Sequence, residues 1–174
     1  MLEWVKENVA FLTLAITIVG GGFALLQWKK QIDIKRTEFA YQIMEKLRNN
    51  KEIAQTCYMI EYGEFRYNDE FHNNHALEHK IDELLSVLNY VCYLLRNRAI
   101  GKRDFSIFKY ETVWILKSKE IQAYLWNLYH WSQRNKTPCS FQFLIDWGLQ
   151  NNLFPPNFTS KECQTFIRRK HLNF

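Results

Sequence analysis

Arg66 and His72 are the residues of this chain whose types and spacing most directly suggest chemistry. An arginine can hold a phosphate group, and a histidine can move the proton of a hydroxyl near neutral pH. Together they could cleave RNA at a 2′-hydroxyl. Five residues separate the two. In a chain of this composition, however, about one Arg–His pair with four to six residues between its members arises by chance. A ribonuclease is therefore one hypothesis, and a chance match is the other.

A second group of polar residues could hold a metal ion. His75 and His79 are four positions apart, so a helix places both on one face, with Asp82 one turn further on and Asp69 and His72 just before. The spacing matches no closed zinc motif, and the segment is polar enough to be ordinary surface. We therefore predict no metal site, no cofactor and no catalytic residue.

Basic and aromatic clusters raise the question of nucleic acid. Basic residues at 96–103 could contact RNA or phospholipid, but cations are also favoured at the C-terminal end of a helix, which is the interpretation we prefer. Aromatic side chains with helical spacing near the C-terminal end could stack on bases, but are more often core. These aromatic residues are Trp126, Tyr129, Trp131, Phe141, Phe143 and Trp147. Direct binding of nucleic acid stays open.

The elements that would position these residues begin with an uncharged stretch. Asn8 to Trp28 is a run of 21 residues without a charge. A helix of that length reaches roughly 31 Å, which matches the hydrocarbon core of a bilayer. We predict a transmembrane helix here. A cleaved signal peptide is the alternative, but the residues before the run carry no positive excess and the run is long for such a peptide.

The flanks of this stretch predict its orientation. Trp4 and Trp28 stand near its two ends, as aromatic anchors at the membrane interface do. Lys29 and Lys30 follow it directly. The excess of positive charge on this side predicts a single-pass protein with its N-terminus outside and its C-terminal domain in the cytoplasm.

Small and polar residues recur along the stretch at alternating steps of three and four. This spacing is the period of helices packed side by side. We name these positions the seam: Ala10, Thr13, Thr17, Gly20, Ala24, Gln27 and Gln31. Small residues let membrane helices approach closely, so the seam predicts self-association, and in a ring it could line a narrow pore. The alternative is that threonine and glycine are merely tolerated there.

The rest of the chain reads as an all-α fold. Apolar residues recur with helical spacing over 51–62, after an interruption at Asn49–Asn50, and over 76–98 and 140–150. Between these, Asp104 can cap a helix through Leu116, and Ser118 starts a further one through Tyr129. Thr159 with Glu162 forms a capping-box pattern that predicts a last helix over 160–170. We expect three parts: residues 1–28 as N-terminal tail and transmembrane helix, 29–48 as a juxtamembrane helix, and 49–174 as a cytoplasmic helical bundle.

Composition limits the remaining classes. Few glycines and prolines and many aromatic residues exclude a disordered chain. Cys57, Cys92, Cys139 and Cys163 are widely spaced, which is typical of reduced thiols rather than a disulfide framework. The net charge of +5 fits a protein that faces anionic membrane lipid as well as it fits nucleic acid.

The layout resembles a known family. An Arg and a His with four to six residues between them form the motif of the HEPN domains, which are helical and can cleave RNA, and five residues separate Arg66 from His72. One membrane helix followed by an aromatic, all-helical domain with a remnant of this motif at Arg66 and His72 is similar to the small membrane accessory proteins of type VI-B CRISPR systems. Here Tyr67 follows the arginine, where active HEPN members usually carry a polar residue.

The resemblance implies a function. It implies a HEPN-like bundle and a ring-shaped homo-oligomer, with an octamer as one candidate, in the bacterial inner membrane. The ring would act as a pore that depolarises the cell when a partner, an RNA-guided RNase, recognises phage RNA. It implies no independent nuclease activity. The alternatives are a membrane-tethered HEPN ribonuclease and a passive scaffold that recruits a cytosolic partner to the membrane.

Overall fold

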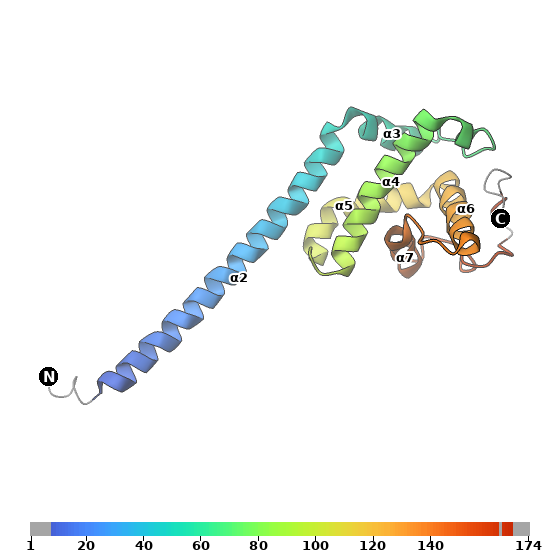
Figure 1. Cartoon of the computed structure of the whole chain (residues 1–174). Helices are drawn as coiled ribbons and strands as arrows, with labels where there is room; N and C mark the ends of the chain where they lie inside the picture. The colour runs from blue at the N-terminus through green and yellow to red at the C-terminus, as the bar shows by residue number, and fades with distance from the viewer. Residues whose placement is uncertain (1–7, 164, 169–174) are drawn as a thin grey trace. The chain divides into compact units, whose positions relative to one another are not determined.

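The computed structural model describes residues 8–163 and 165–168, apart from the side chains of Ala10 and Leu12. These residues form helices and no strands, which confirms the predicted all-α class. The helices are α2 (Val9–Asn49), α3 (Lys51–Glu61), the 3-10 helix η1 (Phe71–Asn73), α4 (His75–Arg96), α5 (Lys102–Lys117), α6 (Lys119–Asn135) and α7 (Gln142–Gln150) (Figure 1). All four cysteines are free thiols, as expected.

The chain forms two compact units, Met1–Phe39 and Ala40–Phe174. Most of α2 belongs to the first unit, whose large apolar side chains are exposed along the described part of the helix. Among them are Phe11, Ile16, Val19, Phe23, Leu26 and Trp28. No helix in the described ranges is both long enough and apolar enough to cross a membrane. The predicted N-terminal helix is therefore present, whereas its prediction as a membrane span has no support from the structure.

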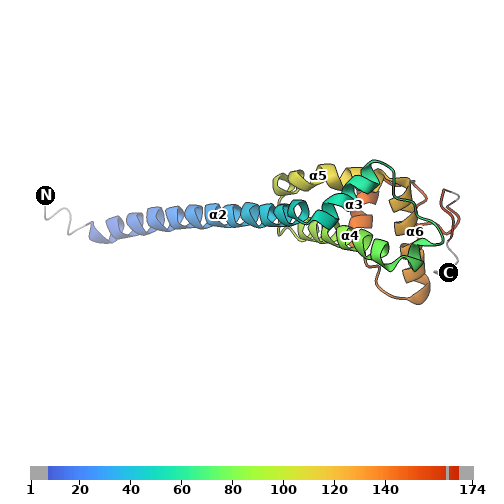
Figure 2. The same ribbon diagram turned by 90° about the horizontal axis from the view of Figure 1, so that it is seen from above.

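The second unit is a helical bundle arranged around α4. This helix contacts α3, α5, α7 and η1, and Figure 2 shows it running beside α3 in the view from above. Its apolar face is fully buried at Ile81, Leu84, Leu85, Leu88 and Val91, because these residues recur every three to four positions and so lie on one side of the helix. The predicted helix over 76–98 is confirmed within two residues at each end.

Polar side chains set the boundaries of the bundle helices. The Asn50 side chain accepts hydrogen bonds from the backbone N–H groups of Glu52 (3.0 Å) and Ile53 (3.3 Å), and so starts α3 where an interruption is expected. Asn74 caps α4 in the same way through Leu77 N–H. At α5 the sequence suggests Asp104 as the cap itself, but its carboxylate accepts from Gly101 N–H (2.9 Å) from inside the first turn.

The predicted last helix over 160–170 is wrong for the residues that the structure describes. Residues 160–163 and 165–168 form turns, and the Ser160 hydroxyl accepts from Glu162 N–H at 3.2 Å instead of capping a helix. Tertiary packing opposes the local pattern here. Phe158, Cys163 and Phe166 are all buried, so this segment packs against the core without forming a helix over the described residues. The remainder of the predicted helix, residues 169–170, lies outside the described residues.

Candidate functional site

The threonines of the seam hold their hydroxyl protons inside α2. Thr13 Oγ1 donates to the Val9 carbonyl and Thr17 Oγ1 to the Thr13 carbonyl, each at 2.8 Å. A hydroxyl bonded this way needs no other partner for its proton, so it can face an apolar neighbour at low cost. Its oxygen lone pairs remain able to accept from water or from another chain.

The glycines of α2 have no packing role inside the chain. A Cβ added at Gly20, Gly21 or Gly22 would meet nothing within 4 Å. Each glycine costs a helix roughly 1 kcal/mol relative to alanine. Three consecutive glycines therefore weaken α2, and nothing in the described part of this helix's own unit packs on them.

The other seam positions can be placed as follows. Thr13, Thr17, Gly20, Ala24, Gln27 and Gln31 are all exposed, and the side chain of Ala10 lies outside the described residues. Of the predicted interface anchors, Trp28, Lys29 and Lys30 are exposed on α2, whereas Trp4 lies outside the described residues. The seam is therefore an open helix face in this chain.

The Arg66–His72 pair lies in the connection between α3 and α4, as the polar sequence there predicts. Arg66 is exposed and its Nη1 donates to the Phe65 carbonyl at 3.2 Å. His72 lies in η1 with 10% of its side chain exposed. The two side chains thus have different environments: one faces solvent and the other packs inside.

Both ring nitrogens of His72 have protein partners. Nδ1 lies 2.6 Å from Glu78 Oε1, and because a carboxylate can only accept, Nδ1 carries the proton. Nε2 lies 3.0 Å from the Tyr67 hydroxyl, which donates to it when the ring is neutral. The imidazole also packs against the rings of Phe71 and Tyr124. A general acid or base needs a nitrogen that reaches the substrate, so this geometry favours a structural role for His72.

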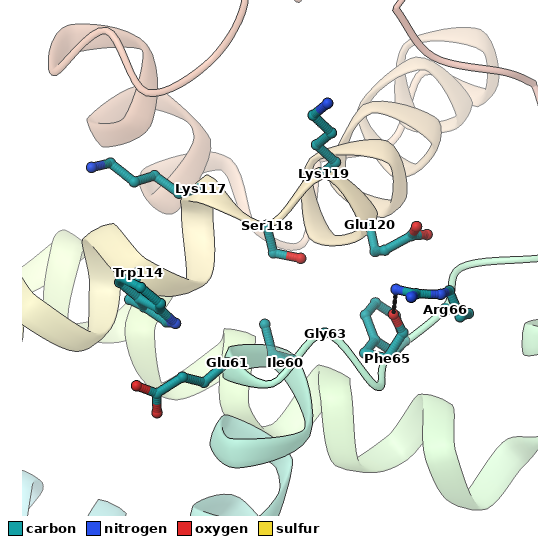
Figure 3. Close-up of a pocket in the computed structure, with 10 residues that line it drawn as sticks. All are labelled: Ile60, Glu61, Gly63, Phe65, Arg66, Trp114, Lys117, Ser118, Lys119 and Glu120. Atoms are coloured by element: carbon teal, nitrogen blue, oxygen red, sulfur yellow. Dashed lines mark hydrogen bonds between the residues drawn. The ribbon is translucent and has the colours of Figure 1, made fainter.

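Arg66 lines an open cavity of about 380 Å³ (Figure 3). The cavity lies between the 60–66 segment and the junction of α5 with α6. Its wall carries Trp114, Ser118 and Glu120, and the Glu120 carboxylate accepts from Tyr67 N–H at 2.8 Å. Lys117 and Lys119 stand at its rim, where Figure 3 shows their amines directed outward.

The histidines and aspartates that the sequence offers as possible metal ligands do not form one group in the described part of the structure. Asp82 accepts a hydrogen bond from the Tyr124 hydroxyl at 2.6 Å. Burial raises the pKa of the Asp82 carboxyl, and the Tyr124 hydrogen bond opposes this shift. His72 is bound to Glu78 as described. Among the described residues, no three histidine, cysteine or acidic side chains, His75, His79 and Asp69 included, come together as ligands of one ion.

The aromatic and basic clusters serve mainly in packing. Trp126 and Phe141 are buried, while Trp131 is partly exposed. Arg96 binds Asp146 at 2.7 Å and lies over the Phe143 ring, so it connects α4 to α7. The core interpretation therefore holds for Trp126 and Phe141, whereas Arg96, Arg98, Lys102 and Arg103 are all exposed to solvent.

The polar network around His72 is the feature that sequence reasoning missed. Tyr67, His72 and Glu78 form one hydrogen-bonded row, and Tyr124 with Asp82 adds a second pair beside it. Glu78 and Asp82 lie four apart on α4, which is the only sequence signal for a shared face. Tyr67 and His72 are near Glu78 in sequence, whereas Tyr124 of α6 lies 42 positions from Asp82.

No family model, curated protein or solved structure matches this chain.

Proposed function

We propose that this chain is an oligomeric membrane pore that depolarises the bacterial inner membrane. In this proposal it is an accessory effector of RNA-targeting CRISPR antiviral defence, and its functional partner is a type VI-B RNA-guided RNase. The bundle is a HEPN-like domain without catalytic residues. The link to defence rests on the family resemblance of the sequence layout.

One observation supports the pore itself. The first unit exposes a helix with large apolar side chains, and its three glycines contact no other side chain among the described residues. Phe11, Ile16 and Val19 are at least 70% exposed. Large exposed apolar patches of this kind usually mark a surface that contacts a membrane or another protein. The support for membrane insertion is the whole uncharged stretch from Asn8 to Trp28 in the sequence. The seam then brings copies of α2 together while the bulky residues face lipid.

The pore proposal predicts a sensitive seam. Thr17→Leu places a branched apolar side chain where neighbouring helices approach, so we expect release of a small dye from liposomes to fall at least about tenfold. Ile16→Leu is the matched control, because it changes a lipid-facing position and keeps its volume. The measurement is dye release at equal amounts of inserted protein.

Unchanged dye release by the Thr17→Leu variant would contradict the seam. RNA cleavage that disappears in an Arg66→Ala, His72→Ala variant would instead favour the ribonuclease.

A further inference from the structure

A second cavity lies wholly within the second unit, between the last turns of α2 and helices α3, α4 and α5. It encloses about 460 Å³, which is within the range of small-molecule sites. Its apolar surface comes from Met44 and Leu47 of α2 and from Leu84 and Leu88 of α4. An apolar group of a few carbon atoms would therefore be removed from water here.

The polar part of this cavity is the Glu111 carboxylate, one oxygen of which accepts no hydrogen bond from the described residues. Glu111 Oε1 lies 3.8 Å from Arg48 Nη2, whose side chain is 72% exposed, so the pair is weak. The Glu111 side chain is 30% exposed, but its Oε2 atom is buried, and no donor among the described residues bonds to that atom. A buried acceptor without a donor is costly, and natural proteins seldom leave one unless a ligand or water supplies it.

The charged residues of the lining give the cavity a net negative charge. Glu61 is a second carboxylate, against Arg48 as the cationic residue of the lining. The Cys57 thiol also lines the cavity. It is neutral, because burial and, to a smaller extent, the Glu111 and Glu61 carboxylates raise its pKa to about 11. Tyr58 and Tyr110 line the cavity as well, and tyrosine ring faces attract organic cations.

We propose that this cavity binds an organic ammonium ion with an apolar body. The ammonium donates to the Glu111 carboxylate with Glu61 nearby, and the apolar body covers the leucines and Met44. An anion would meet two carboxylates, and an uncharged apolar ligand would leave Glu111 Oε2 without its donor. This inference does not depend on the proposed pore.

Two probes of the same shape test the charge requirement. The full chain in nanodiscs, with empty discs as the baseline, is titrated with 2-phenylethylammonium and with uncharged 2-phenylethanol. A charge-assisted hydrogen bond predicts about tenfold tighter binding of the ammonium. Equal affinity for the two probes would overturn the proposal.

Variants locate the site. Glu111→Gln should reduce the preference for the ammonium to less than about twofold, whereas Glu162→Gln, on an exposed turn outside the cavity, should retain it. Ala54→Leu fills the cavity from α3 and should weaken both probes at least about tenfold. A full preference in the Glu111→Gln variant, or unchanged binding in the Ala54→Leu variant, would place the ligand elsewhere and refute this site.

Discussion

His72 is held by the protein from both sides of its ring, by Glu78 at Nδ1 and by Tyr67 at Nε2. Arg66, by contrast, donates a hydrogen bond to the carbonyl of the preceding residue, Phe65, within the part of the chain that the structure describes. The His72 side chain is therefore held inside the fold, whereas the Arg66 side chain is exposed. The two residues should respond differently to substitution.

His72→Ala should lower the free energy of unfolding by about 2 kcal/mol, because it removes one hydrogen bond to the half-buried Glu78 and another to the buried Tyr67. Arg66→Ala should change it by less than about 0.5 kcal/mol, as exposed substitutions usually do. Thermal unfolding of the full chain measures both. A destabilised Arg66→Ala variant beside an unaffected His72→Ala variant would contradict this assignment.

Asp82 gives a pH dependence of known sign. Its pKa is raised in the fold, chiefly by burial, so the folded protein binds the proton more tightly than the unfolded chain. The stabilisation by the protonated form is present below the ordinary aspartate pKa and is lost as the pH rises through the raised value.

Asp82→Asn cannot ionise, and its side-chain oxygen can still accept from Tyr124. The variant should therefore gain stability relative to the native chain between about pH 4 and pH 7. Unfolding midpoints across this range test it, and a difference that shrinks with rising pH would show the opposite sign.

Among the helices, the bundle elements obey their local signals more closely than the C-terminal segment does. Asn50 and Ser118 mark helix boundaries that the sequence predicts, since the signal at each is local. The C-terminal segment carries a capping-box pattern at Thr159 and Glu162 but forms no helix over 160–163 and 165–168, and Phe154 and Phe158 just before it are buried and stack on each other. The Tyr124–Asp82 contact joins residues 42 positions apart, and such pairs are fixed by packing that no local pattern reports.

Glycines in two helices should behave in opposite ways. A Cβ at Gly148 of α7 would collide with the Phe154 ring, whereas one at Gly22 of α2 would meet open space. Gly148→Ala should destabilise the bundle by about 1–3 kcal/mol. Gly22→Ala is the control and should cost nothing, since alanine favours the helix. Equal unfolding midpoints for Gly148→Ala and the native chain would contradict the packing of Phe154 on α7.

For the whole molecule, the proposed division of labour is between a helix that associates and a bundle that carries the ligand cavity. An anchor without the seam separates a pore from a scaffold. Replacing residues 8–28 by an unrelated monomeric membrane helix should abolish dye release while the protein stays in the membrane, because the seam residues that bring helices together are gone. Defence that survives this exchange would instead support the passive scaffold.

The particle formed after extraction from the membrane tests the central proposal most directly. Electron microscopy and mass measurement of the detergent-solubilised full chain should show a closed ring of several subunits, with the N-terminal helices gathered at its axis. Solitary chains at the concentrations where dye release occurs would contradict the account, since one helix alone cannot enclose a pore.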